Sequence, residues 1–376
     1  MNSFTRRRLV AGLLGSGLLS ACATRPAPGG AAGGVSGGVG PLPGAEITPE
    51  RVTRVLVGLR PYRPAGYVVE ATRLGDKRLV HHYGHGGAGI TLAWGTAHEA
   101  VELGFSGAGA AHAVLGCGVV GLATARLLQR RGARVTIYAA ELPPLTTSNI
   151  AGGHWWPYSA FDGEVAGEAF KSRFHQAVRV AYRELQHMAG ARYGVHWRRN
   201  YAVMDEQRPI GPFTESMRDV APELQMLAPG EHPFGPRWVQ QFSAMMIEPA
   251  VHLRALLDDF LLAGGQLVVR RFDAPQQLVA LPEAVVFNCT GLGARALFGD
   301  EQLEPARGQL VVLLPEPGLD YNLFYRGAYV FPRTDGLVLG GTFQRGQWNL
   351  QADPADTERI LAGAKAAFAT RLPPQA

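Results

Sequence analysis

The sequence has few cysteines and little net charge, and these scarcities exclude several classes of protein. Its 376 residues include three cysteines, Cys22, Cys117 and Cys289, with no metal-site spacing and no disulfide framework. The formal net charge is +5, and no basic stripe is interleaved with aromatic residues, which argues against nucleic-acid binding. A hydrophobic content of 47% provides for a large core and one or two intertwined domains. These features are typical of a globular chain of enzyme size.

The beginning of the chain resembles an export signal. A basic head, Arg6 to Arg8, precedes an apolar run that is too short to span a bilayer stably and that ends in Leu-Ser-Ala-Cys22. The paired arginines resemble the twin-arginine signal for folded cargo, and the last four residues resemble a lipoprotein box. We expect residues 1–22 to be a signal peptide, Cys22 to carry a lipid anchor, and the protein to reside on the periplasmic face of a bacterial membrane. The alternative is an uncleaved anchor helix. Residues 23–45, dense in Gly, Ala and Pro, predict a flexible linker.

The strongest motif is a glycine turn between a strand and a helix. Residues Ala113 to Ala125 read as an apolar strand, a turn with Gly116, Gly118 and Gly121, and an Ala/Leu-rich helix; Arg134 to Tyr138 reads as a second strand. Gly116 permits a sharp turn, Gly118 a close approach of the backbone to a pyrophosphate, and Gly121 close packing of helix on sheet. The segment predicts a dinucleotide site, and the alternative is a purely structural turn.

The loop after the second strand carries groups suited to a dinucleotide. The hydroxyls at Thr146 to Ser148 can donate to phosphate and ribose oxygens, and Gly152-Gly153 lets backbone amides approach a flat ring. A polar surface loop is the alternative. The second strand ends in Ala139-Ala140, where dinucleotide folds usually present an acid to the ribose. Glu141 is the nearest acid.

Two further segments precede this motif. Val57 to Pro64 holds Arg60 next to prolines that stiffen the backbone, so a fixed guanidinium can face a carboxylate; a surface arginine is the alternative. Leu79 to Ala97 is dense in glycine, which indicates backbone approaching a ligand. Its adjacent histidines His81 and His82 point apart on an extended segment with no thiol or carboxylate nearby, so we predict no metal site.

These segments together resemble the D-amino-acid oxidase family, FAD enzymes related to glutathione reductase. The resemblance covers Leu79 to Gly89 with Gly95-Thr-Ala97, the arginine segment Val57 to Pro64, the loop Tyr138 to Tyr158, and the stretches Ala284 to Gly293 and Ala306 to Gln309. In the family the first two lie near the C-terminus, whereas here they come first. The chain therefore looks like a circular permutant, in which Phe105 to His112 joins the moved piece, residues 46–104, to the first nucleotide-binding strand; a rearranged gene model is the alternative.

The resemblance implies an α/β fold with a Rossmann-type FAD-binding domain and an antiparallel substrate domain. We expect residues 46–376 to form this unit, with FAD-binding parts at about 75–165 and 250–300 and substrate-domain parts at about 46–74, 166–249 and 301–360. We also expect helices at 164–193, 250–262 and 356–371. The implied FAD contacts are Gly86, Gly87, Gly89, Ile90, Thr91, Gly116, Gly118, Val119, Val120, Gly121, Thr146, Thr147, Ser148, Gly152, Gly153, Thr290 and Gly291.

The implied reaction is oxidation of a D-amino acid, with oxygen as acceptor, to a 2-oxo acid, ammonia and hydrogen peroxide by hydride transfer from Cα to flavin N5. Arg60, aided by Tyr325 and Tyr329, is expected to bind the carboxylate, and the Gly87 carbonyl to receive the amine. We favour neutral or apolar substrates, because Phe343 stands where D-aspartate oxidases carry an arginine, although Arg326 is a possible substitute. The alternatives are a glycine/sarcosine-type or D-aspartate oxidase, a membrane-coupled dehydrogenase, a nicotinamide-dependent enzyme, and an inactive flavin-binding protein. The sequence leaves the oligomeric state open.

Overall fold

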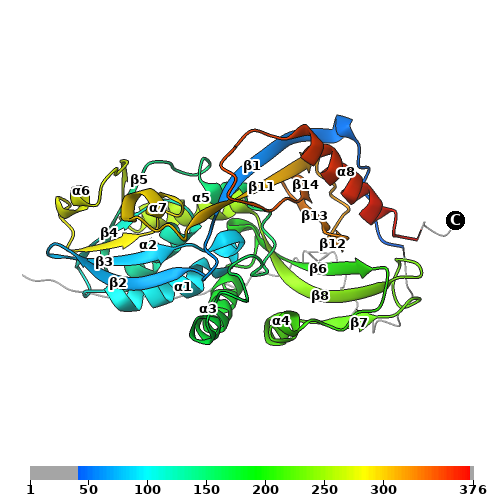
Figure 1. The fold of residues 1–376 in the computed structure, drawn as a ribbon, viewed down its shortest axis with the longest axis horizontal. Helices are drawn as coiled ribbons and strands as arrows, with labels where there is room; N and C mark the ends of the chain where they lie inside the picture. The colour runs from blue at the N-terminus through cyan, green and yellow to red at the C-terminus, as the bar shows by residue number, and fades with distance from the viewer. Residues whose placement is uncertain (1–40, 373–376) are drawn as a thin grey trace, which may run out of the picture. The chain divides into compact units, whose positions relative to one another are not determined.

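A mostly parallel sheet of six strands forms one part of the molecule (Figure 1). The computed structural model describes residues 41–372, so the predicted signal peptide, the lipidated Cys22 and most of the linker lie outside the described residues. Strands β3, β10, β4, β5 and β9 pair in parallel, and β2 adds an antiparallel edge. The strands are, in sheet order, β2 (Val68–Leu74), β3 (Lys77–Tyr83), β10 (Val285–Asn288), β4 (Ala111–Leu115), β5 (Arg134–Ala139) and β9 (Gln266–Val269).

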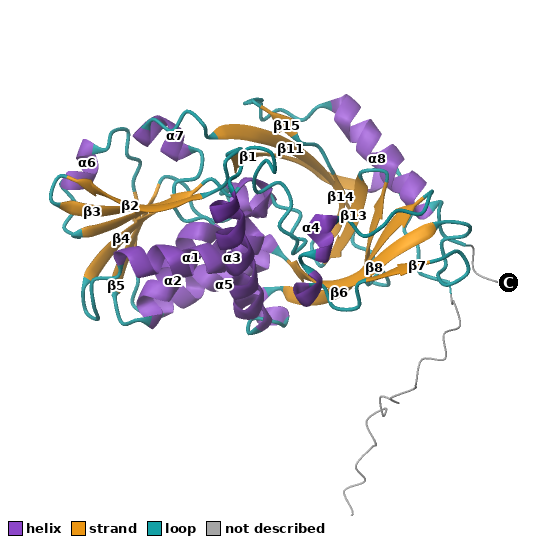
Figure 2. Ribbon diagram, turned by 60° about the horizontal axis from the view of Figure 1, so that its bottom comes forward, coloured by secondary structure: helices purple, strands orange, loops and turns teal. Residues whose placement is uncertain are grey.

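Helices cover both faces of this sheet, as doubly wound folds require (Figure 2). On one face lie α1 (Gly89–Gly104), α2 (Val119–Arg130), α3 (Glu168–Gln186) and α5 (Pro249–Leu262). On the other lie the short helices α6 (Gln276–Val279) and α7 (Gly293–Phe298). Because β3, β4 and β10 are covered on both sides, their residues are almost all buried, and β4 and β10 are mostly apolar rather than alternating.

A nine-stranded sheet forms the second part, and all its pairs are antiparallel except β6 with β12. In sheet order the strands are β1 (Val52–Tyr62), β11 (Glu304–Leu313), β14 (Gly336–Gly340), β13 (Ala328–Arg333), β12 (Tyr321–Tyr325), β6 (Val195–Met204), β8 (Trp238–Ile247) and β7 (Gln225–Leu227), with β15 (Gln344–Arg345) beside β11. Helix α8 (Pro354–Phe368) packs on one face of it. The Asp353 carboxylate accepts a hydrogen bond from Ala355 N at the start of α8, and Pro354 takes the first helical position.

The remaining short elements lie in the connections between these strands and helices. They are α4 (Pro212–Glu215) and the 3₁₀ helices at Pro49–Arg51, Gly86–Ala88, Thr147–Ile150, Ala191–Tyr193 and Arg218–Val220. The 3₁₀ turn at Pro49–Arg51 leads directly into β1, which runs on through Arg60 to Tyr62.

The segment that precedes the glycine turn is part of both sheets. Strand β1 pairs with β11 along its length, with Arg60 opposite Ala306, and β3 lies in parallel beside β10. The N-terminal and C-terminal halves of the chain therefore cannot be separate domains. Both sheets need strands from each half.

Two predicted boundaries between the FAD-binding and substrate-domain parts differ from the structure. Residues up to 74 were assigned to the substrate part, but β2 is an edge strand of the six-stranded sheet because it pairs with β3. Helix α3, also assigned to the substrate part, packs against α1 through the common core of the helical face. Strands β12 and β13 form a hairpin that turns at Arg326-Gly327.

Three structural absences hold within residues 41–372. Cys117 and Cys289 are free and buried. No group of three or more His, Cys, Asp or Glu side chains in this region has the arrangement of a metal site. None of its helices has the length and apolar character needed to cross a membrane.

Candidate active site

A cavity of about 670 Å³ lies where the two sheets meet, and it brings together almost all the predicted site residues. Its lining comes from the end of β3 and the start of α1, the turn between β4 and α2, the loop after β5, the end of β10, and strands β1, β11 and β13. All the predicted FAD contacts line it except Gly121, which lies behind it: Gly86, Gly87, Gly89, Ile90, Thr91, Gly116, Gly118, Val119, Val120, Thr146, Thr147, Ser148, Gly152, Gly153, Thr290 and Gly291.

The glycine turn has the geometry that a pyrophosphate site requires. Gly116 has a φ of +102°, and a Cβ there would lie 2.6 Å from the Cys289 carbonyl oxygen. A Cβ on Gly121 would lie 2.1 Å from the Gly116 carbonyl oxygen, so only glycine allows α2 to pack this close to β4. The predicted roles of these glycines in the turn and in packing agree with this arrangement, and the N-terminus of α2 faces the cavity.

The loop after β5 contacts the same helix N-terminus. The Ser148 hydroxyl accepts a hydrogen bond from Val119 N at 3.1 Å, and the Thr146 hydroxyl donates to Asn149 Oδ1 at 2.8 Å. Thr147 is exposed and lines the cavity. The hydroxyls are therefore close to the first turn of α2, where a phosphate is expected.

The far end of the nucleotide region lies at the ends of β5 and β9. Glu141 lines the cavity there, and so do Ala139 and Ala140, which leave space where an acid commonly stands. Arg270 and Arg271, which directly follow β9, also line this end, and they were not among the predicted site residues. The Arg270 guanidinium stacks on Phe272 at 4.6 Å from the ring centre.

Two buried histidines from the glycine-rich segment line the cavity as neutral rings. His82 Nε2 and His85 Nε2 both contact the Thr96 hydroxyl, at 2.8 and 2.9 Å. Burial lowers the pKa of His85 to about 3 and places the pKa of His82 well below its usual value. His81 points the other way and contacts the Asn288 amide, which confirms that the adjacent rings of His81 and His82 point apart.

Arg60 marks the other end, which we call the substrate end. Its Nη1 donates to the Thr342 carbonyl oxygen at 3.1 Å, and no carboxylate among the described residues pairs with it. Burial lowers the pKa of this guanidinium, and the neighbouring Tyr329 opposes that effect. Gly87 lies beside the Arg60 stem, since a Cβ on Gly87 would lie 3.6 Å from Arg60 Cδ. The structure thus brings Arg60, Gly87 and Tyr329 to one end of the cavity.

The prediction for the second tyrosine, Tyr325, is wrong. In the β12–β13 hairpin Phe324 lies opposite Tyr329, and cross-strand partners share a face of the sheet. Tyr325 is the next residue on β12 and points to the opposite face, where its hydroxyl donates to Asp205 at 2.8 Å. Phe324 takes its place in the cavity lining. The Arg326-Gly327 pair at the turn was the signal that could have revealed this hairpin.

Aromatic rings form the walls of the substrate end. Tyr329 stacks on Phe331 with ring centres 4.5 Å apart, and Phe343 lies 5.7 Å from the Arg60 guanidinium. Trp156 also lines this end. Arg326 does not reach the cavity, because it lies in the exposed hairpin turn and pairs with Asp205 at 2.8 Å. A second cation therefore does not come from Arg326.

The residues of the cavity fit a flavin dinucleotide. One end offers a glycine cradle, a helix N-terminus and hydroxyls for phosphates. The middle offers the close backbone of Gly152 and Gly153, where a Cβ on Gly153 would lie 2.1 Å from the Ile247 carbonyl oxygen. The cavity continues without a break to the apolar substrate end. Such a shape suits a long cofactor with its reactive ring beside Arg60.

Comparison with known proteins identifies the class. The sequence pattern of the family described as "FAD dependent oxidoreductase" matches residues 112–375, and the chain belongs to this family. The cofactor is FAD, and the protein is an FAD-dependent oxidoreductase.

Individual relatives are similar over much of their length. A D-amino-acid oxidase of Rubrobacter xylanophilus is 32% identical over 253 residues, which cover 66% of this chain and 74% of the relative. Human D-aspartate oxidase is 30% identical over 260 residues, covering 66% and 73%. Among solved structures, a glycine oxidase from Bacillus cereus superposes with a TM-score of 0.51 at 17% identity over 70% of this chain and 78% of that one. At that identity, the likeness confirms the fold.

Proposed function

We propose that the protein oxidises neutral D-amino acids to 2-oxo acids and ammonia, with oxygen as the electron acceptor. The observation that carries this proposal is Arg60, a guanidinium that pairs with no carboxylate of residues 41–372, at the end of an apolar cavity that also holds the FAD-binding cradle. A cation in that position is suited to a substrate carboxylate, because the planar fork binds both oxygens at once.

The chain's own groups hold the substrate. The Arg60 fork and the Tyr329 hydroxyl bind the carboxylate, and the Gly87 carbonyl accepts a hydrogen bond from the amine. Burial raises the pKa of Tyr329, so its hydroxyl stays protonated and can donate. FAD, held by the glycine turn and the loop after β5, would supply the two-electron oxidant for loss of hydride from Cα. With a neutral amine the hydride can leave directly, so no side-chain base is required and the protein's task is orientation.

Neutral side chains suit the walls of the substrate end. Phe324, Phe331 and Trp156 line it, and its described lining offers no cation besides Arg60. A side-chain carboxylate such as that of D-aspartate would be buried there without a partner, which is costly. We therefore infer a preference for apolar and uncharged D-amino acids over D-aspartate.

The test is a visible spectrum and a peroxide assay on the purified protein. We expect a yellow protein that produces peroxide with D-alanine or D-methionine, and far less with D-aspartate, the L-enantiomers, sarcosine or glycine. Activity centred on sarcosine or glycine would instead support a glycine/sarcosine-type oxidase. A flavin that no amino acid reduces would support an inactive flavin-binding protein, and reduction without oxygen consumption would support a dehydrogenase.

We further propose that the protein is exported folded, with FAD bound, and is anchored by a lipid on Cys22. The support is the sequence of residues 1–22. Changing Arg6 and Arg7 to Lys should leave flavin-loaded protein in the cytoplasm. Equal export of this variant would reject the proposal.

We also infer that the chain is a circular permutant of its family. The family pattern begins at residue 112, and the strands of the preceding segment complete both sheets. The start of that segment lies against the end of the chain, since Arg371 Nη1 donates to the Leu42 carbonyl oxygen at 2.6 Å. A rearranged chain in which residues 105–372 precede residues 42–104 should therefore fold and bind FAD like the natural one. Failure to bind FAD would contradict the inference.

A further inference from the structure

The Arg60 guanidinium is held in place by a backbone carbonyl and by close packing against a glycine. Its Nη1 donates to the Thr342 carbonyl oxygen, and it lies flat against Gly308 of β11, where a Cβ would be 2.3 Å from Nη1. The Thr342 hydroxyl in turn accepts a hydrogen bond from Gln309 N at 2.7 Å. The direction of the Arg60 fork therefore depends on where Thr342 lies relative to β11.

Thr342 belongs to residues 341–353, which we call the strap. The strap leaves β14, pairs briefly with β11 through β15, and reaches the start of α8. Three of its large side chains, Phe343, Trp348 and Leu350, are exposed, so apolar packing contributes little to holding it. Polar contacts to β11 and its neighbours, together with the Phe343 ring on Tyr62, hold it in place.

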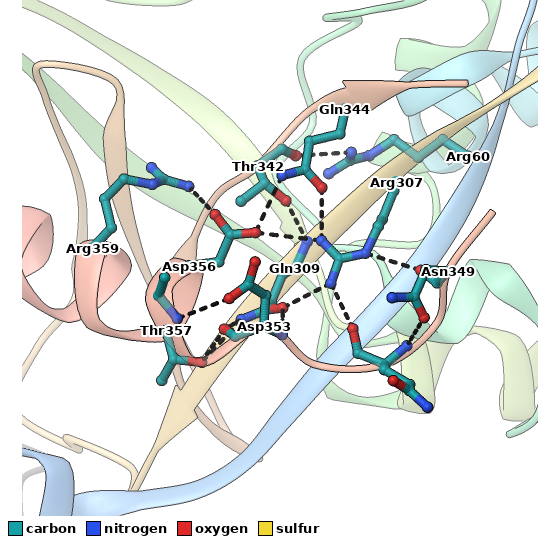
Figure 3. Close-up of polar contacts among 12 residues, drawn as sticks. Arg60, Arg307, Gln309, Thr342, Gln344, Asn349, Asp353, Asp356, Thr357 and Arg359 are labelled. Atoms are coloured by element: carbon teal, nitrogen blue, oxygen red, sulfur yellow. Dashed lines mark hydrogen bonds and ion pairs between the residues drawn. The ribbon is translucent and has the colours of Figure 1, made fainter. Parts of the chain in front are cut away.

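The Arg307 side chain supplies three of these contacts (Figure 3). It is the residue before Gly308, and its side chain lies on the opposite face of β11 from Arg60, with an exposure of 4%. Its Nε donates to the Asn349 carbonyl oxygen at 2.9 Å, and Nη2 to that of Gln351 at 2.6 Å. Nη1 donates to Gln344 Oε1 at 2.7 Å. One guanidinium thus binds the strap at three points.

The same side chain connects the strap to β11 and α8. Arg307 Nη2 also donates to Gln309 Oε1 at 3.1 Å, and Nη1 pairs with Asp356 of α8 at 3.3 Å. The Gln309 amide continues the network to the Asp353 carbonyl oxygen at 2.8 Å. All three guanidinium nitrogens are used, in several directions. A lysine has three donors at a single nitrogen and cannot reproduce that pattern.

We propose that Arg307 is a positioning residue for substrate binding: by fixing the strap on one face of β11, it sets the Thr342 carbonyl that orients the Arg60 fork on the other face. This rests on the proposed function of Arg60 as the carboxylate ligand. Loss of the Arg307 contacts lets the strap, and with it the Arg60 fork, adopt several positions. Substrate then binds more weakly, while the FAD cradle, which is built from other segments, stays intact.

The experiment compares Arg307→Lys and Arg307→Met with the wild-type holoenzyme. Each variant is assayed for KM and kcat with a neutral D-amino acid, and for the Kd of benzoate, a carboxylate without an oxidisable amine, from the change in flavin absorbance. We expect KM and the benzoate Kd to rise together by about tenfold or more in both variants, with kcat changed by less than about threefold and flavin content unchanged.

The matched control is Arg359→Ala. Arg359 also pairs with Asp356, at 3.0 Å, but from the exposed side of α8 and without contact to the strap. Its KM and benzoate Kd should stay within about twofold of wild type. An equal loss in this variant would mean that α8 stability, rather than the strap, controls binding, and would overturn the proposal.

A double variant tests whether Arg307 acts through Arg60. In an Arg60→Ala background, Arg307→Lys should have little further effect on benzoate binding, because the group it orients is gone. If Arg307→Lys weakens benzoate binding in the Arg60→Ala background as much as in the wild type, the proposal is overturned. It is also overturned if Arg307→Lys and Arg307→Met both fold and bind benzoate like the wild type. If the wild-type protein holds flavin but binds no benzoate, the proposed function fails instead. If the Met variant does not fold, the Lys variant and Gln344→Ala, which removes one strap acceptor, provide the same comparison.

Discussion

A methyl group added at Gly308 would displace the Arg60 guanidinium without removing its charge. A Cβ there would lie 2.3, 2.4 and 2.5 Å from Nη1, Nη2 and Cζ of Arg60. Ordinary contacts between such atoms are about 3.5 Å, so the guanidinium must shift by about 1 Å in Gly308→Ala. The clash is with the end of a side chain, which can move, rather than with backbone. The fold should therefore survive.

We expect the displaced guanidinium to bind the substrate more weakly and to orient it less well. A misplacement of about 1 Å at a reacting geometry can cost about 100-fold in rate, which corresponds to about 2.7 kcal/mol of transition-state stabilisation. We expect kcat/KM for a neutral D-amino acid to fall by about that factor, with the flavin spectrum and flavin content unchanged. The assay is peroxide production normalised to bound flavin, together with benzoate titration.

Gly318→Ala is the matched control for this prediction. Gly318 lies in the loop after β11, where a Cβ would have nothing within 4 Å and the φ angle is ordinary. Its kinetics should equal those of wild type. If Gly308→Ala also shows wild-type kcat/KM, then the Arg60 guanidinium does not bind substrate in the position the structure gives it, and the assignment of the substrate end fails.

Three further predictions concern other parts of the site and the core. Tyr329→Phe should raise KM several-fold, whereas Tyr325→Phe should leave KM unchanged because its hydroxyl faces Asp205; the reverse result would restore the sequence-based assignment. Gly121→Ala should abolish flavin retention on gel filtration, because its Cβ would meet backbone at 2.1 Å; a yellow, stable variant would refute the tight packing of α2. Burial lowers the pKa of His85 to about 3 and of His252 to about 4, so the unfolded state binds more protons below about pH 6.5 and stability falls as the pH falls. Each of these two histidines should lower the free energy of unfolding by about 2 kcal/mol at pH 5 relative to pH 8. His252→Asn should therefore make the melting temperature depend less steeply on pH. An unchanged slope would contradict this prediction.

The parts of the fold that follow from local patterns could be predicted from the sequence. The glycine turn between β4 and α2 has a fixed spacing with a direct steric reason, and its position was correct. Helix α5 begins at Pro249 and ends just before Gly264, and α8 begins at Pro354 after its Asp353 cap, so these signals act locally. These features depend only on neighbouring residues.

The parts of the fold that depend on contacts between distant segments could not be predicted from the sequence. The face occupied by Tyr325 depends on a two-residue turn, and a misread turn reverses every later side chain on the strand. β2 looks like a strand of either sheet until its partner β3 is known. The surroundings of Arg307 come from the strap and α8, and no spacing in the sequence indicates that these segments meet.

The pairing of β1 with β11 has a consequence for the order in which the protein becomes active. Its partners are about 250 residues apart, so the loop between them closes at a high entropic cost and only after most of the polypeptide has left the ribosome. The arginine proposed to recognise the substrate lies on the first strand of the described residues, yet the strand that supports it is synthesised about 250 residues later. A chain that lacks β11 can complete neither the nine-stranded sheet nor the support of Arg60, so the proposed activity depends on synthesis of the C-terminal part.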